Sequence, residues 1–217
     1  MSGKITVKGE GKITAAPDTI SLSAKLSSTD KDYAVAVGNS ANQLEKLKNG
    51  IKKFGFDKKT LKTSNFAVNA DYESVNDENG RYKRVFKGFT CVHDLVLEFD
   101  FDSKKLADVI SAVAESLSEP DISIDFTVKD TDKLRDELLK NAVANARKKA
   151  ELLCAAAGVT LGTLVSIDYT SVDLFPDCAT SYAVDAKCAR LAAPKAVNIL
   201  PEDIEINDSV TIVWETV

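Results

Sequence analysis

Hydrophobic and polar residues alternate along several stretches of this chain, a pattern typical of a β-strand with one buried face. The first stretch places Ile5, Val7 and Ile13 on the same face as Gly9 and Gly11. The same criterion predicts strands over residues 4–14, 19–28, 60–73, 81–101, 122–128, 160–171 and 204–216. We expect the first two strands to form an antiparallel pair joined by a turn at Pro17-Asp18.

Three other stretches carry an apolar residue at every third or fourth position, which is the spacing of an amphipathic helix. They predict helices over residues 31–54, 103–118 and 131–157. Asp30 or Asp32 can cap the first helix, and Asp102 or Ser103 the second. The third helix has an alanine-rich stripe, which lets it lie close to its neighbour. The residues expected on that stripe are Leu134, Leu138, Ala142, Ala146, Ala150, Leu153 and Ala157.

The predicted helices are interspersed with hairpins and do not alternate regularly with strands. The longest hairpin joins residues 60–73 to 81–101 and has Asn79-Gly80, a strong turn dipeptide, at its tip. This order predicts an α+β fold, a largely antiparallel sheet built from long hairpins with three helices packed on it. We expect one domain over residues 1–217, with faint halves at 1–101 and 102–217. Residues 172–202 show no clear period and form an irregular segment.

Composition narrows the function classes. The 33 acidic residues exceed the 28 basic ones and give a net charge of -5, which argues against binding nucleic acid. The apolar runs are shorter than the roughly 20 residues of a transmembrane helix, so no transmembrane segment is expected. The first residues, "MSGKITVKGEGK", lack the apolar region of a secretory signal and predict a cytoplasmic protein. A mature chain already trimmed of its signal would belong to the periplasm or cell envelope.

Two motifs give the chain a resemblance to a known family. "ITVKGEGKITAAPDTISL" resembles the opening signature of the SIMPL-domain family, which is I-x-V-x-G-x-G followed by Pro-Asp. "NARKKAELLCAAAGVTLGTLVSI" resembles the second signature, A-x-x-K-A-x-x-L and then a G-x-x-L-G turn into a strand. The matching positions of the second motif are Ala146, Lys149, Ala150, Leu153, Gly158, Leu161 and Gly162. The elements between the motifs also match in order, so the resemblance covers nearly the whole chain.

The resemblance implies relatives of unknown function, among them bacterial YggE-like and outer-membrane immunogenic proteins. Many members are exported, some are linked to defence against oxidative stress, and one assembles into a ring-like or channel-like homo-oligomer. An animal relative acts as a kinase-associated signalling adaptor. The resemblance implies no cofactor and no catalytic residue. We therefore expect a non-enzymatic protein that forms homo-oligomers or binds another protein.

Four cysteines and one histidine supply the candidate chemistry. Cys91 and His93 form a C-x-H motif on one strand face, but a structural zinc site needs four ligands. Cys178 and Cys188 complete such a set only by folding over that face, so a packed, hydrogen-bonded His93 is favoured. The same two cysteines are candidates for a redox pair, although two ordinary loop thiols are favoured. Thiol- or metal-dependent stress response is thus the alternative function.

Three further motifs have plainer interpretations. Residues 9–11, "GEG", do not form a phosphate loop, because a strand continues where a helix should begin. These glycines are expected to let another backbone or a helix approach closely. The basic run at 147–149 is predicted to lie on a solvated face and Cys154 to pack between helix and sheet. No nucleophile is placed beside His93, which makes a hydrolase site a weak hypothesis.

Overall fold

The computed structural model describes residues 3–76, 82–116, 121–170, 178–184 and 200–217. They belong to two compact units. Unit 1 comprises Met1–Asp18, Thr127–Ala179 and Glu202–Val217, and unit 2 comprises Thr19–Phe126 and Thr180–Pro201. Each unit combines helix with antiparallel sheet, which confirms the predicted α+β class. The single domain over residues 1–217 stays a prediction.

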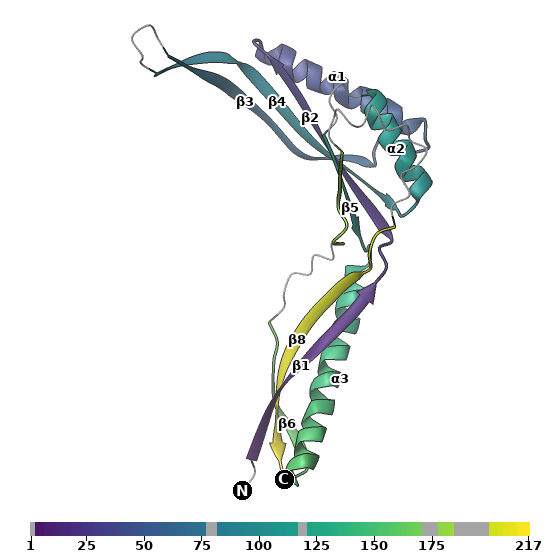
Figure 1. The fold of residues 1–217 in the computed structure, drawn as a ribbon, viewed down its shortest axis with the longest axis vertical. Helices are drawn as coiled ribbons and strands as arrows, with labels where there is room; N and C mark the ends of the chain where they lie inside the picture. Colours follow the sequence, from purple (N-terminus) through teal and green to yellow (C-terminus); the bar gives the residue numbers. More distant parts are fainter. Residues whose placement is uncertain (1–2, 77–81, 117–120, 171–177, 185–199) are drawn as a thin grey trace. The chain divides into compact units, whose positions relative to one another are not determined.

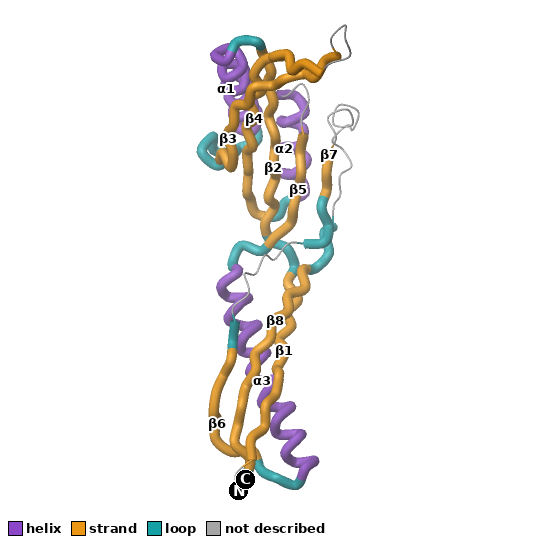
Figure 2. The backbone as a smooth tube through the Cα atoms, turned by 90° about the vertical axis from the view of Figure 1, so that its left-hand side faces the viewer, coloured by secondary structure: helices purple, strands orange, loops and turns teal. Residues whose placement is uncertain are grey.

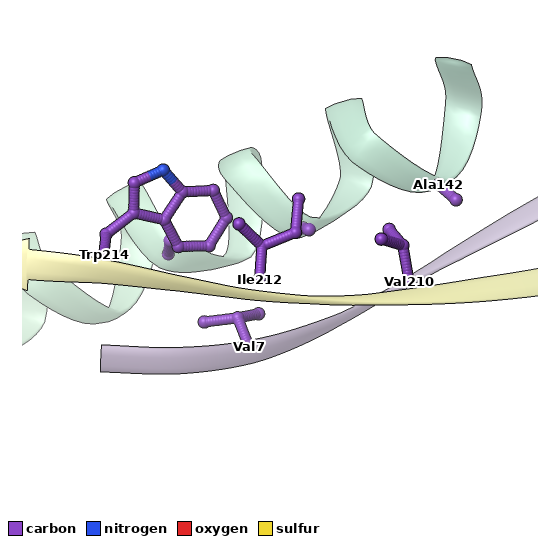
Figure 3. Packing of buried hydrophobic residues seen from close by; sticks show 7 residues of the cluster. Val7, Ala142, Val210, Ile212 and Trp214 are labelled. Carbon is purple, nitrogen blue, oxygen red and sulfur yellow. The ribbon is translucent and has the colours of Figure 1, made fainter. Parts of the chain in front are cut away.

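Unit 1 is a three-stranded sheet covered by one long helix. Its strands are β1 (Gly3–Ala15), β6 (Leu161–Asp168) and β8 (Ile204–Thr216), in the order β1-β8-β6, and β8 is antiparallel to both neighbours. The helix α3 (Thr131–Ala157) runs along one face of this sheet (Figure 1). Figure 3 shows Val210, Ile212 and Trp214 of β8 pointing toward α3. The buried cluster consists of Val7, Ala142, Ala146, Ala150, Val210, Ile212 and Trp214.

The helix and the first strand of unit 1 touch backbone to backbone. A Cβ atom built on Gly9 would lie 2.1 Å from the carbonyl oxygen of Ala142 and 2.5 Å from the Cβ of Ala146. A Cβ atom on Gly11 would lie 2.2 Å from the carbonyl oxygen of Leu138. The prediction that these glycines permit a close approach is therefore confirmed. The small alanine side chains of α3 form the other side of this contact.

The contact stripe of α3 differs from the predicted one at its end. The buried residues are Leu138, Ala142, Ala146, Ala150 and Cys154, each four positions apart. Steps of four residues exceed a full turn by about 40°, so this line winds around the helix and follows the twist of the sheet. Leu153 and Ala157 were expected inward but are exposed, because they lie off that line. Cys154 packs inward as predicted.

The basic run at 147–149 divides between solvent and packing. Arg147 and Lys148 are exposed, and Arg147 pairs with Glu151 at 2.9 Å. Lys149 instead is half-buried, and its Nζ donates a hydrogen bond to the carbonyl oxygen of Lys8 at 3.2 Å. The solvated face therefore accounts for two of these side chains, while the third reaches β1.

Unit 2 is a larger sheet with two helices on one face. Along the chain, β2 (Thr19–Asp30), α1 (Tyr33–Lys52), β3 (Leu61–Asn76), β4 (Tyr82–Asp100), α2 (Ser103–Ser116) and β5 (Asp121–Thr127) follow one another, and β7 (Tyr182–Val184) comes later. The strand order is β3-β4-β2-β5-β7. A β-α-β-β-α-β chain in the order β3-β4-β2-β5 is the ferredoxin-like, split βαβ arrangement. Figure 2 shows the strands side by side with α1 and α2 behind them.

Two predictions about pairing were wrong. β1 pairs with β8, and β2 pairs with β4, so the first two strands lie in different sheets. Pro17-Asp18 connects β1 to β2 without forming a hairpin turn. At this connection the Asp18 amide donates to the carbonyl of Thr127 at 3.1 Å. The Asp18 carboxylate also accepts from the amide of Lys129 at 2.9 Å. Residues 172–202, expected to be irregular throughout, include β7, which pairs with β5.

We predict that Gly9→Ala lowers the free energy of unfolding, because the added methyl group has no room beside α3. The usual cost of overpacking is about 1–3 kcal/mol. Gly38→Ala is the matched control. Gly38 lies within α1 and has no atom within 4 Å of an added Cβ, so alanine should stabilise by about 0.5–1 kcal/mol. Urea unfolding measures both changes. Equal stability of wild type and Gly9→Ala would contradict the contact.

Candidate functional site

The predicted C-x-H pair lies inside unit 2, on β4. Cys91 is fully buried, and His93 is 6% exposed. The Nε2 atom of His93 lies 2.8 Å from the hydroxyl oxygen of Thr63, and the ring of Phe66 meets the imidazole edge-on at 5.1 Å. Both candidates thus sit on the covered face of the sheet, where they pack against neighbouring residues.

The described part of unit 2 brings no further metal ligand to these two residues. Across the residues that the structure describes, no group of three or more His, Cys, Asp or Glu side chains could hold a metal ion. Cys178 belongs to unit 1, and Cys188 lies outside the described residues. The metal site at Cys91 and His93 stays a prediction.

Of the two cysteines in the predicted redox pair, the structure describes Cys178 but not Cys188. The Cys178 thiol is buried and donates to the carbonyl oxygen of Glu202 at 3.0 Å. A buried thiol usually packs as a small hydrophobe. Because Cys188 is not described, its pairing with Cys178 stays a prediction.

His93 is a buried histidine with one unsatisfied nitrogen. Its Nδ1 atom is buried and has no hydrogen-bond partner among the described residues. Burial lowers the pKa of His93 from its usual value, and Lys48 of α1 lowers it further, while Asp94 acts in the opposite direction. The neutral imidazole is therefore the form that this packing favours.

The outer face of the sheet in unit 2 carries several acidic side chains. Its β4 positions include Asp94, Glu98 and Asp100, and the amide of Asn65 donates to Asp94 at 2.9 Å. Single-stranded nucleic acid is bound by aromatic side chains in a positively charged groove. The acidic side chains of β4 differ from such a groove, although Lys25 and Lys62 share their face.

A pocket opens at this face, over the irregular pairing of β3 with β4. Its lining includes one lysine and one glutamate. The lining residues are Thr60, Lys62, Thr63, Ser64, Val96 and Glu98. They include hydroxyl groups but neither histidine nor cysteine.

The long β3–β4 hairpin carries a feature that the sequence analysis did not identify. Tyr33 meets Phe89 at 5.6 Å between ring centroids, Phe89 meets Phe86 at 5.1 Å, and Phe86 meets Tyr72 at 5.7 Å. The guanidinium carbon of Arg84 lies 4.8 Å from the centre of the Tyr72 ring. We call these five residues the aromatic face. It begins beside the first residue of α1 and continues along the hairpin.

Most of the aromatic face is exposed to solvent. Tyr33, Tyr72 and Phe86 are 54%, 50% and 45% exposed. Their edge-to-face contacts hold the rings in place without covering them. Arg84 and Phe86 are two residues apart in the second hairpin arm, a spacing that predicts side chains on the same face of the strand. The sequence did not show where α1 stops covering the sheet.

Comparison with known proteins gives one family and several relatives. The model of the SIMPL family, described as a protein of unknown function (DUF541), matches residues 5–214. The chain is 25% identical over 211 residues to "Uncharacterized protein YggE" of Edwardsiella ictaluri, covering 97% of this chain and 85% of that protein. It is 28% identical over 171 residues to the "26 kDa periplasmic immunogenic protein" of Brucella melitensis, covering 77% and 67% of the two chains.

An animal protein also matches. The "Interleukin-1 receptor-associated kinase 1-binding protein 1 homolog" of Xenopus laevis is 28% identical over 168 residues, covering 76% of this chain and 62% of that protein. Of the helices that the structure describes, none combines the length and apolar character needed to cross a membrane. These relatives carry no named activity from which a catalytic residue could be assigned.

We predict that acid destabilises this protein partly through His93. The unfolded chain gains a proton on this histidine near pH 6.5, whereas burial opposes that proton in the folded chain. The stability that the neutral His93 contributes is therefore fully present above about pH 6.5 and is lost progressively as the pH falls below that value. Thermal unfolding at about pH 7.5 and about pH 5.5 should show a smaller acid shift in His93→Gln than in wild type. Equal shifts would contradict the assignment.

Proposed function

Because the chain belongs to the SIMPL family of proteins of unknown function, we propose that it works without catalysis, as a protein-binding module whose partners include further copies of itself. The observation that carries this proposal is the aromatic face of the β3–β4 hairpin. It presents exposed tyrosine, phenylalanine and arginine side chains, which are residue types enriched at protein interfaces.

The geometry of the aromatic face favours tight contacts. Aromatic rings bury about 150–250 Å² each and lose little conformational entropy when only two side-chain torsions are fixed. Here the rings of Tyr33, Phe89, Phe86 and Tyr72 already support one another, so part of the ordering cost is met before a partner arrives. Arg84 adds a cation at the same surface.

The chemistry of the described residues supports a function without catalysis. His93 faces the protein interior, where Nε2 contacts Thr63, and no cysteine or carboxylate of the described part completes a metal site with it. The pocket over the β3 irregularity has Lys62 and Glu98 as its ionisable lining residues. At the first place the histidine is packed inside the unit, and at the second the lining contains neither histidine nor cysteine.

The names of the relatives support the same proposal. The Xenopus laevis relative is named as a binding protein of a receptor-associated kinase, which is a protein-binding role. The Brucella relatives are named periplasmic, which supports our proposal that this chain belongs to the cell envelope, the second of the two compartments expected from the sequence. A link to oxidative stress stays a prediction, as does the alternative function through Cys178 and Cys188.

We predict that the aromatic face contributes to assembly. Solution mass measured by light scattering behind a sizing column should exceed that of one chain, with and without reductant. Tyr72→Ser combined with Phe86→Ser should lower that mass, because truncating an interface hot spot costs about 2 kcal/mol, roughly a 30-fold weaker association. Val85→Ser is the control, since Val85 is also exposed but follows the opposite strand alternation.

The outcomes separate the two functions. A mass that depends on reductant, and that loses this dependence in Cys178→Ser with Cys188→Ser, would favour the thiol-dependent alternative. A single-chain mass in both conditions would contradict self-assembly. An unchanged mass in the Tyr72→Ser, Phe86→Ser variant would show that the aromatic face is not the contact.

A further inference from the structure

The strand β6 forms an exposed apolar edge of the sheet in unit 1. Leu164 and Ile167 are 54% and 50% exposed, and Val165 is 43% exposed. Leu164 stands opposite Trp214, and Ile167 opposite Ile212, so both share the side of the sheet that α3 covers. The helix lies mainly against β1 and β8 and leaves this side of β6 largely uncovered (Figure 1).

The opposite edge of the same sheet is closed. There the Nζ of Lys149 donates to the carbonyl oxygen of Lys8 at 3.2 Å. The side-chain oxygen of Asn145 accepts from the amide of Glu10 at 3.1 Å. Two side chains of α3 thus occupy backbone groups of β1 with which an incoming strand would otherwise pair.

Among the described residues, the edge of β6 is less protected than that of β1. The sheet order β1-β8-β6 places no described strand beyond it. Natural edge strands are protected by lysine, by proline, by a bulge or by a covering element. Of these, β6 has the irregular pairing with β8 between Leu161 and Ser166. β6, "LGTLVSID", contains neither lysine nor proline, and its one charged residue, Asp168, is the last of the strand.

We propose that β6 pairs antiparallel with β6 of a second copy of this chain, joining two three-stranded sheets into one around a two-fold axis. The position of Asp168 favours this arrangement. Antiparallel pairing centred on Val165 separates the two carboxylates by about 20 Å, beyond the Debye length at physiological salt. Parallel pairing would set them side by side. The inference rests on the proposed function, because it names a surface through which a second copy binds.

The same pairing brings apolar side chains together. Leu164, Val165 and Ile167 of each copy lie within a few positions of the two-fold axis, so each would meet apolar neighbours from the other copy. Apolar and β-branched cross-strand pairs are the unit of sheet stabilisation. A two-fold interface is also self-complementary, so one strand supplies both halves of the contact.

Val165→Lys tests this contact by placing a charge in the centre of β6. The two lysines would face one another across the axis, and the mass of the assembly should fall to half that of the wild type. Thr6→Lys is the matched control, since it adds the same charge at an exposed position of β1, the closed edge of the same sheet. Its mass should equal that of the wild type.

A second variant keeps the test decisive if lysine disturbs folding. Val165→Cys, made together with Cys178→Ser and Cys188→Ser, should form a covalent dimer under mild oxidation with copper phenanthroline. Residues near the axis of an antiparallel pair have Cα atoms about 4.5–5.5 Å apart, within reach of a disulfide. Thr6→Cys in the same background should give no more covalent dimer than the background itself.

The outcomes distinguish this inference from the proposed function. Wild-type mass in Val165→Lys without crosslinking of Val165→Cys would overturn the β6 pairing. If the Tyr72→Ser, Phe86→Ser variant then loses mass, the proposed function stands on the aromatic face alone. A single-chain mass for the wild type at every concentration would overturn both, and would leave β6 as an edge for a strand of another protein.

Discussion

Unit 1 depends on the backbone contact between β1 and α3. Gly9 and Gly11 give the helix room that no other residue would leave, and the alanines of α3 complete the fit. The short distance has a second effect. It brings Asn145 and Lys149 within hydrogen-bonding distance of β1, and so closes that edge of the sheet. A helix drawn toward β1 leaves the far strand β6 uncovered. One packing constraint therefore explains why one edge is closed and the other open.

In unit 2, the difference in length between helix α1 and strand β4 also leaves a surface uncovered. α1 has 20 residues and spans about 30 Å, whereas the 19 residues of β4 extend about 63 Å. The helix starts at Tyr33, where the carboxylate of Asp32 accepts from the amides of Ala34 and Val35. The hairpin continues beyond that start. Beyond that start the aromatic rings of the hairpin contact one another in place of a helix, which is why they remain exposed.

Much of this fold follows from local pattern, and what does not is non-local. Period-two and period-four spacing locates the strands and helices within a few residues, and it identifies Gly9 and Gly11 as contact positions. Alternation shows which face of a strand is buried but not which strand lies beside it, so the pairing of β1 with β8 was missed. Leu153 was misplaced because spacing alone does not show how the sheet twists under α3.

The candidate site was harder to predict for the same reason. Cys91 and His93 share a strand face, as their spacing requires, but their interior position depends on how α1 and β3 pack against β4. The aromatic face depends on where one helix begins, and the open edge of β6 depends on which strands pair. Both surfaces are left uncovered by the described residues of their own unit. On these two proposals, a chain with two such surfaces of different chemistry joins more than two copies, because each surface binds independently of the other.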